Sequence, residues 1–175
     1  QPSQGDYFQA VKGGGHGDYK LITYAPDSVQ EMVDFVKLGF DVAEKYRNPV
    51  MILADGAMGQ MMEKVELFDP IPQKSEFEDW CTTGKPEDTD ARFITSLFIQ
   101  PEEMEQVNLR IQKKYREIEK NEILVEEMNT GDMEYLFTGF GLGARICMKA
   151  MELAREKGHK VGLIRPRTLY PYPYD

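Results

Sequence analysis

Three short stretches of the sequence carry residue types that could contact a cofactor or a phosphate group. The first is a glycine turn in which Gly139, Gly141 and Ala144 satisfy the pattern G-x-G-x-x-A. Such a turn lets a pyrophosphate approach the N-terminus of the helix that follows. A dinucleotide site also expects an acidic residue at the end of the next strand, whereas this strand runs into Arg165 and Arg167. An arginine could meet the 2′-phosphate of NADP. The alternative is a tight strand-to-helix turn that needs small residues for packing.

The second stretch is the glycine-rich segment at residues 13–18 (GGGHGD), which contains His16. Holding so many glycines in a helix or a strand would cost entropy, so the segment is predicted to be a loop. Its backbone could approach a phosphate or a cofactor, and the imidazole of His16 could donate a proton. The loop precedes a strand rather than a helix, which excludes a Walker A loop. The alternative is that His16 is exposed to solvent and has no role in catalysis.

The third stretch is Asp55-Gly56, which follows the apolar run VMIL at residues 50–53. Ligands in open α/β sheets bind at the carboxyl ends of the strands, and Asp55 would lie at that edge. The competing interpretation is that Asp55 only belongs to a turn and binds no ligand. No serine, histidine and aspartate form a recognisable nucleophile elbow, and the two cysteines and two histidines match no metal-ligand pattern. The sequence therefore names no catalytic residue and no metal ligand.

A β-α-β unit positions the second and third stretches. Residues 21–24 are a short apolar strand. Ser28 and Glu31 form a capping box that starts a helix running to about Tyr46. Residues 50–53 suit a central strand of a parallel sheet. The helix is expected to be well buried, because its apolar residues form one wide face: Val29, Met32, Val33, Val36, Phe40 and Ala43, widened by Phe35, Leu38 and Val42.

A long connection leads to a second β-α-β unit. Residues 69–100 are rich in proline, glycine, threonine and charge, which predicts a surface excursion between domains. A mostly charged helix follows from Pro101 to about Asn121.

In the second unit, residues 133–138 and 161–164 are predicted strands. The helix between them begins after the glycine turn and stops at Gly158. Its expected apolar face consists of Ile146, Ala150, Leu153 and Ala154. The tail at residues 169–174 is too rich in proline to extend the sheet.

Neither unit makes a complete domain, since each offers about two strands and doubly wound sheets have four or more. The unpaired strand edges are expected to be completed by sequence outside this chain or by another subunit. The net charge of -9 argues against a nucleic-acid or anionic-membrane partner, and no apolar run is long enough to span a bilayer. The two distant cysteines suit a reducing cytoplasm.

Four stretches resemble one enzyme family nearly end to end. They are QPSQGDYFQAVKGGGHGDYKLI, APDSVQEMVDFVKLGFDVAEKYRNPVMILADGAMGQMMEKVEL, the helix PEEMEQVNLRIQKKYREIEKNE and the final YLFTGFGLGARICMKAMELAREKGHKVGLIRPRTLYPYP. The chain is similar to an internal part of the α subunit of the 2-oxoacid:ferredoxin oxidoreductases, most of all the 2-oxoisovalerate (3-methyl-2-oxobutanoate) type. Only the region around Trp80 fits loosely.

The resemblance implies an α/β fold made of parts of two three-layer α/β domains with mainly parallel sheets. Residues 1–68 would be the back half of the domain that binds the pyrimidine ring of thiamine diphosphate. Residues 69–130 would be a linker with a connector helix, and residues 131–175 the start of a domain that resembles the C-terminal domain of transketolase. The family's catalytic glutamate and substrate-binding arginine lie in the front half of the first domain, so no catalytic residue carries over. Gly14, His16 and Asp55 are expected on the cofactor-facing edge.

The implied activity is oxidative decarboxylation of a 2-oxoacid to acyl-CoA, with ferredoxin as electron acceptor. Thiamine diphosphate would be the electron sink, shared with a partner subunit, while other subunits would hold Mg²⁺ and the iron–sulfur clusters. This chain would cradle the cofactor, hold subunits together and be inactive alone. The residues leave two other functions open: a nucleotide-binding module built on residues 139–144, and a non-catalytic interaction domain that uses the acidic connector and the tyrosine- and proline-rich tail.

Overall fold

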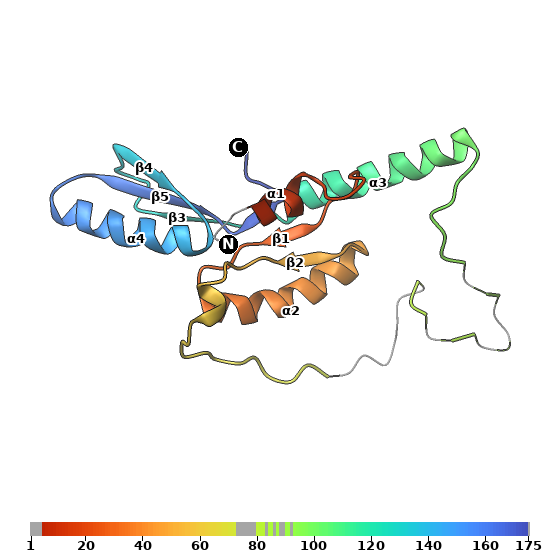
Figure 1. Cartoon of the computed structure of the whole chain (residues 1–175), viewed down its shortest axis with the longest axis horizontal. Helices are drawn as coiled ribbons and strands as arrows, with labels where there is room; N and C mark the ends of the chain where they lie inside the picture. The colour runs from red at the N-terminus through yellow and green to blue at the C-terminus, as the bar shows by residue number, and fades with distance from the viewer. Residues whose placement is uncertain are drawn as a thin grey trace. The chain divides into compact units, whose positions relative to one another are not determined.

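The computed structural model describes residues 5–72, 80–82, 84–85, 87, 90–91 and 93–174 (Figure 1). The chain divides into two compact units. The first joins Gln1–Leu67 to Gln112–Asp175 and contains both three-stranded sheets. The second covers Phe68–Ile111.

The first sheet has the strand order β2-β1-β6. β1 (Ile22–Tyr24) pairs in parallel with β2 (Val50–Ile52), as the two apolar runs predicted. The central position expected for β2 is not seen, because β1 is its only partner among the described residues. On its other side β1 pairs antiparallel with β6 (Thr168–Tyr170). The expectation that the tail forms no strand is therefore wrong for β6. The prolines of this region lie outside its Thr-Leu-Tyr sequence, which favours a strand.

α1 (Gly5–Lys12) and a loop lead into β1, and α2 (Val29–Tyr46) follows it, as expected. The N-cap prediction is confirmed, since the Ser28 hydroxyl accepts a 3.2 Å hydrogen bond from the Glu31 N–H. The Glu31 carboxylate accepts a 3.0 Å bond from the Asp27 N–H, one residue before the position that a capping box uses. This shift leaves the carboxylate beside Arg165, which lies far along the chain.

The buried stripe of α2 differs from the predicted one. It consists of Glu31, Phe35, Gly39, Val42 and Tyr46. Two predicted core residues face outward, since Val36 is 44% exposed and Phe40 is 70% exposed, so the expectation of a well-buried helix is wrong on this side. Gly39 explains the orientation, because a Cβ there would lie 3.3 Å from Val50 Cγ1. The backbone of α2 thus approaches β2 closely through Gly39.

The second sheet has the order β3-β5-β4. β4 (Tyr135–Thr138) and β5 (Val161–Pro166) were predicted and pair in parallel. β3 (Val125–Met128) was not predicted and pairs antiparallel with β5. Each sheet thus contains one parallel and one antiparallel pair. α4 (Gly141–Glu156) packs on this sheet around a core of Met151, Val161 and Leu163.

The ends of α4 match the sequence, but its buried face does not. The helix begins within the glycine turn, and Gly158 follows it with a φ of 87°. Ile146 is 65% exposed and Leu153 is 46% exposed, whereas Ala144 and Met151 are buried. Only Ala154 of the four predicted residues packs against the core of this sheet.

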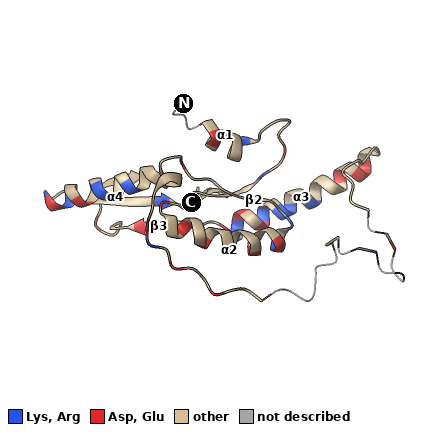
Figure 2. Ribbon diagram, turned by 60° about the horizontal axis from the view of Figure 1, so that its bottom comes forward, with Lys and Arg blue, Asp and Glu red and all other residues tan. Residues whose placement is uncertain are grey.

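The long connection has the predicted character. Its described residues between positions 61 and 100 form no helix or strand, after a short 3-10 helix, η1 (Met58–Gln60). α3 (Pro101–Asn121) follows and carries interspersed acidic and basic residues (Figure 2). Its buried residues are Tyr115 and Ile118, which belong to the first unit. No helix in the described part of the chain is both long and apolar enough to cross a membrane.

Candidate functional site

Asp55 lies at the carboxyl edge of β2, as predicted, and both its carboxylate oxygens accept backbone hydrogen bonds. Oδ1 accepts a 3.0 Å bond from the Met58 N–H, which holds the turn into η1. Oδ2 accepts a 3.1 Å bond from the Leu142 N–H in the first turn of α4. The carboxylate of Asp55 therefore caps a helix that follows it by more than eighty positions, and its negative charge favours that helix N-terminus.

The glycine turn before α4 has the geometry of a packing turn. A Cβ on Gly139 would lie 3.3 Å from both the backbone N of Ala144 and the backbone C of Gly143. Gly141 has a φ of 54°, and a Cβ there would lie 3.6 Å from Asp55 Oδ2. In the first turn of α4 the Leu142 N–H already donates to the Asp55 carboxylate, which lies where a nucleotide would place its phosphate. These contacts favour the packing interpretation of residues 139–144.

Tyr7 of α1 lies beside Asp55 and the turn before α4, a position that was not predicted from the sequence. Its ring meets Phe140 edge-on at a centroid distance of 4.9 Å, and its hydroxyl lies 3.7 Å from the position of a Cβ on Gly141. Burial raises the pKa of the Tyr7 phenol, and the negative charge of Asp55 raises it further. The edge therefore combines a carboxylate with a phenol that stays protonated at neutral pH.

The glycine-rich loop is held by a different set of contacts. The buried Gly14 donates a 3.1 Å hydrogen bond from its N–H to the Tyr19 hydroxyl, and a Cβ on Gly14 would lie 2.8 Å from that oxygen. His16 is exposed. Gly15 and Gly17 have positive φ angles of 56° and 76°, with open space around the position of a Cβ. In the described part of the chain, no hydrogen bond or ion pair connects this loop with Asp55.

A buried cluster of charges joins α2 to β5. The Arg165 guanidinium donates 2.8 Å hydrogen bonds to both carboxylate oxygens of Glu31 and a 2.7 Å bond to Glu126 Oε2. Arg167 donates a 2.6 Å bond to Glu31 Oε1, and Asp27 lies 3.3 Å from Arg165. The side chain of Arg165 is 4% exposed and that of Glu31 is 11% exposed. Sequence reasoning assigned Arg165 to a strand end and did not find these partners.

The pKa values in this cluster follow from burial and pairing. Burial alone would raise the pKa of Glu31, but hydrogen bonds from Arg165 and the Asp27 N–H lower it to about 2. The pKa of Asp27 is raised by burial and by the charges of Glu31 and Glu126, which outweigh the charge of Arg165. Glu31 is therefore the carboxylate that Arg165 stabilises most.

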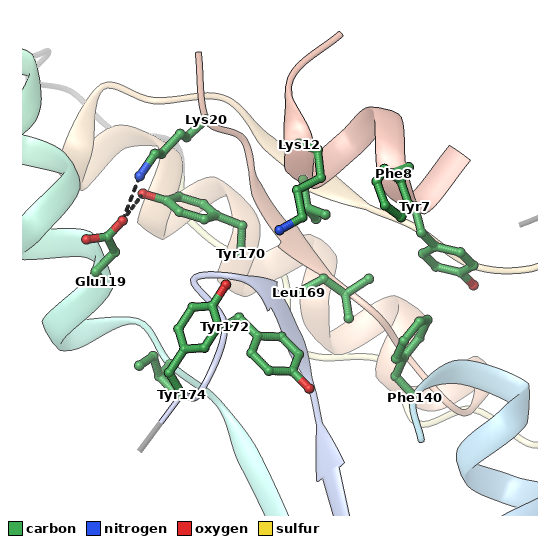
Figure 3. Close-up of a pocket in the computed structure, with 12 residues that line it drawn as sticks. Tyr7, Phe8, Lys12, Lys20, Glu119, Phe140, Leu169, Tyr170, Tyr172 and Tyr174 are labelled. Atoms are coloured by element: carbon green, nitrogen blue, oxygen red, sulfur yellow. Dashed lines mark hydrogen bonds and ion pairs between the residues drawn. The ribbon is translucent and has the colours of Figure 1, made fainter. Parts of the chain in front are cut away.

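A cavity of about 820 Å³ opens beside α1, lined mainly by aromatic side chains (Figure 3). The aromatic residues are Tyr7, Phe8, Phe140, Tyr170, Tyr172 and Tyr174. Lys20 at one end is already paired, since its ammonium lies 2.8 Å from Glu119 Oε1 and 5.0 Å from the centre of the Tyr170 ring. The Tyr170 hydroxyl donates a 3.2 Å bond to the same glutamate oxygen. The cavity thus offers aromatic walls and two lysines, Lys12 and Lys20, of which Lys20 is neutralised by Glu119.

Two family models match the chain in succession. Residues 1–130 match the model described as pyruvate flavodoxin/ferredoxin oxidoreductase, thiamine diphosphate-binding. Residues 133–175 match pyruvate:ferredoxin oxidoreductase core domain II. The chain belongs to the pyruvate flavodoxin/ferredoxin oxidoreductase family. The resemblance inferred from the sequence is confirmed, and so is the α/β fold class.

Similar subunits are known in methanogens. The ketoisovalerate oxidoreductase subunit VorB of Methanothermobacter thermautotrophicus is 42% identical over 174 residues, which are 99% of this chain and 49% of that subunit. The 2-oxoglutarate synthase subunit KorA of Methanocaldococcus jannaschii is 38% identical over 195 aligned residues, covering 99% of this chain and 53% of that subunit. The chain therefore spans about half the length of the curated relatives it matches.

A solved structure supports the fold. The 2-oxoglutarate:ferredoxin oxidoreductase from Magnetococcus marinus, with 2-oxoglutarate, coenzyme A and succinyl-CoA bound, superposes with a TM-score of 0.64. The match covers 99% of this chain and 36% of that chain, at 24% sequence identity.

The described residues carry no unpartnered buried group that would mark an anchor for thiamine diphosphate. No buried side-chain nitrogen or oxygen among them lacks a hydrogen-bond partner that a cofactor could supply. They also contain no group of three or more histidine, cysteine, aspartate or glutamate side chains that could hold a metal ion. The candidate site in this part of the chain is the edge formed by Asp55, Tyr7 and the turn before α4.

Proposed function

We propose that this chain is part of a multi-subunit 2-oxoacid:ferredoxin oxidoreductase, which decarboxylates a 2-oxoacid oxidatively to acyl-CoA and reduces ferredoxin. The observation that carries the proposal is the succession of both family models along one chain. The relatives of similar sequence bear the names of ketoisovalerate and 2-oxoglutarate enzymes. Those relatives are named as subunits, so the activity belongs to an assembly, and the isolated chain, which spans about half of such a subunit, is expected to be inactive.

Within that assembly this chain lines one side of the thiamine diphosphate site and helps to hold the subunits together. Gly14, His16 and Asp55 are our candidates for residues that face the cofactor. Bound thiamine diphosphate would supply the electron sink for decarboxylation. Asp55 fixes the first turn of α4 at this edge through the Leu142 N–H. Mg²⁺ and the iron–sulfur clusters belong to other subunits, which accords with the two cysteines of this chain. We also infer a cytoplasmic location, since two cysteines far apart in the sequence suit a reducing compartment.

Purification from the native source with an affinity tag on this chain tests the proposal. Co-purifying subunits that carry iron–sulfur clusters are expected, together with reduction of ferredoxin that requires both coenzyme A and a 2-oxoacid. Comparing 2-oxoisovalerate, 2-oxoglutarate and pyruvate identifies the substrate. A protein that purifies without partners and reduces no ferredoxin with any of the three would contradict the proposal.

His16→Gln in the purified assembly tests the loop separately. If His16 faces the cofactor, the variant is expected to lower kcat or to weaken thiamine diphosphate binding. His159→Gln is the matched control, because His159 is also exposed and follows the end of α4. Equal activity of both variants would show that His16 is only solvated.

The two alternatives have less support. A nucleotide module needs an open helix N-terminus at α4, where Leu142 already donates to Asp55. A non-catalytic interaction domain would be favoured by an assembly in which no subunit binds thiamine diphosphate.

A further inference from the structure

The first turn of α4 is attached at two points to the loop of residues 55–66, which follows β2. At the first point, Asp55 Oδ2 accepts a 3.1 Å hydrogen bond from the Leu142 N–H. At the second point, the Arg145 guanidinium donates a 2.7 Å hydrogen bond to Glu63 Oε1. Residues three positions apart lie on the same face of a helix, as Leu142 and Arg145 do. The loop therefore holds one face of α4 with two carboxylates.

The far end of this loop is also bound to the start of α2. Glu63 Oε2 accepts a 3.0 Å hydrogen bond from the Val29 N–H, the first residue of that helix. The Glu66 N–H donates a 2.8 Å bond to Gln30 Oε1, and the Glu66 carbonyl accepts a 3.0 Å bond from Gln30 Nε2. Glu63 thus connects the loop with α2 through one carboxylate oxygen and with α4 through the other.

Arg145 lies where these three elements meet. The nitrogen that binds Glu63 is also 3.3 Å from the Asp27 carbonyl oxygen and 3.8 Å from the Met61 sulfur. The side chains of Arg145 and Glu63 are 36% and 29% exposed, so water screens their attraction only in part. Hydrogen bonds from the Val29 N–H and from Arg145 hold the pKa of Glu63 below its usual range. Glu63 is therefore an anion for Arg145 at neutral pH.

The short helix η1 connects the two attachment points. The Gly59 N–H donates a 3.1 Å hydrogen bond to the Asp55 carbonyl, and the Met61 N–H donates a 3.1 Å bond to the Met58 carbonyl. The Met58 side chain is 1% exposed, which anchors the middle of the loop. Residues 56–62 carry no charge, so they form no ion pair of their own. A movement at Glu63 would therefore be passed along η1 to Asp55.

We propose that Arg145 is a positioning residue for Asp55. By binding Glu63, Arg145 keeps the loop of residues 55–66 against α4, and the Asp55 carboxylate then stays on the Leu142 N–H. With only the Asp55 contact left, the loop could turn about that point. This assignment stands on the contacts alone, whereas its consequence for thiamine diphosphate rests on the proposed function, in which Asp55 faces the cofactor. The competing role for Arg145 is a general contribution to the stability of α4.

Amide hydrogen exchange in the purified assembly separates the two roles. Arg145→Met keeps most of the side-chain length but removes the donors, and the Leu142 amide is expected to exchange at least ~5-fold faster. The Met151 amide, farther along α4, should keep its rate. An unchanged rate at Leu142, or equal acceleration at Met151, would overturn the proposal. Lys149→Met is the matched control, because Lys149 pairs with Glu152 within the same helix, and an equal effect of this variant at Leu142 would also overturn it.

Two further variants test whether the effect passes through Glu63. Glu63→Gln keeps an acceptor for the Val29 N–H but removes the charge, and it should accelerate exchange at Leu142 in the same way. The double variant of Arg145→Met and Glu63→Gln should resemble Arg145→Met alone, because the two residues act as one pair. Fully additive effects would overturn the route through Glu63. Arg145→Lys retains a cation and should restore most of the protection, so it decides the matter if Arg145→Met does not fold.

Thiamine diphosphate binding to the cofactor-free assembly gives the functional readout. Arg145→Met is expected to raise the Kd for thiamine diphosphate at least ~3-fold, while kcat at saturating cofactor stays within about twofold of the natural value. Arg145→Lys should bring the Kd back toward that of the natural assembly. An unchanged Kd beside accelerated exchange at Leu142 would overturn the cofactor-facing role of Asp55. A natural assembly that binds no thiamine diphosphate would contradict the proposed function, whereas exchange at Leu142 would still decide the role of Arg145.

Discussion

Glu31 and Arg165 lie 134 positions apart and meet through two hydrogen bonds of 2.8 Å each. Glu31 belongs to the segment that matches the thiamine diphosphate-binding model, and Arg165 to the segment that matches core domain II. Both side chains are almost fully buried, so neither charge has water to replace a lost partner. The pair therefore fixes the first turn of α2 beside β5.

Arg165→Met should destabilise the chain strongly. The substitution keeps much of the side-chain volume but leaves the Glu31 carboxylate buried with only Arg167 as a cation, which typically costs about 3–5 kcal/mol. The free energy of unfolding in urea measures the effect. Arg116→Met is the control, because Arg116 is exposed on α3, and its change should stay within about 0.5 kcal/mol. Similar losses in both variants would mean that the buried pair contributes nothing specific.

The same pair predicts a pH dependence of stability. The pKa of Glu31 falls from 4.5 to about 2 on folding, so its ionised form stabilises the fold. That contribution is complete above pH 4.5 and is lost as the pH falls toward 2. The difference in unfolding free energy between the natural chain and Glu31→Gln should be largest at neutral pH and should shrink over this range. A difference that stays constant down to pH 2.5 would contradict the lowered pKa.

Two glycine substitutions separate packing from helix propensity in the turn before α4. Gly139→Ala would force a Cβ to within 3.3 Å of backbone atoms and should cost about 1–3 kcal/mol. Gly143→Ala meets nothing within 4 Å inside the helix and should stabilise the fold by up to about 1 kcal/mol. Thermal unfolding of both variants gives the comparison. Tolerance of alanine at Gly139 would remove the packing explanation for that glycine.

Removing the carboxylate of Asp55 should loosen both elements that it holds. Asp55→Ala leaves the Met58 and Leu142 N–H groups without their acceptor, at a cost of about 1–3 kcal/mol. Asp55→Asn keeps one acceptor oxygen and should lose less. Asp41→Ala on the exposed face of α2 is the control for removing a carboxylate and should change stability by less than about 0.5 kcal/mol. Amide exchange at Leu142 reports on the cap directly, and unchanged exchange in Asp55→Ala would argue against it.

Helix and strand positions were predicted from the sequence more accurately than the faces that these elements bury. Ser28 and Gly158 marked helix ends correctly, because caps depend on local backbone chemistry. The exposure of Phe40 was not predictable in this way, since the face that a helix buries depends on which strands lie beside it. β3 was missed because its sequence, VEEM, has two central glutamates and no apolar run.

In the candidate site, too, local positions were predicted from the sequence and packing contacts were not. The position of Asp55 at a strand end followed from the order of the strands alone. Its contact with Leu142 and the approach of Tyr7 depend on how α1 and α4 pack, and no local pattern encodes that. The predicted cofactor-facing role of Gly14, His16 and Asp55 stays a prediction.

The antiparallel pairing of β6 with β1 also constrains how this chain can fold during synthesis. Thr23 and Tyr24 leave the ribosome well before their partners Tyr170 and Thr168, which follow them far along the chain. The first sheet and the ion pair of Glu31 with Arg165 are therefore incomplete until residues 165–170 have been translated. Such a dependence on late residues slows folding and leaves the early strands exposed in the meantime. Translation that stops before β6 should therefore yield a chain that chaperones or proteases recognise.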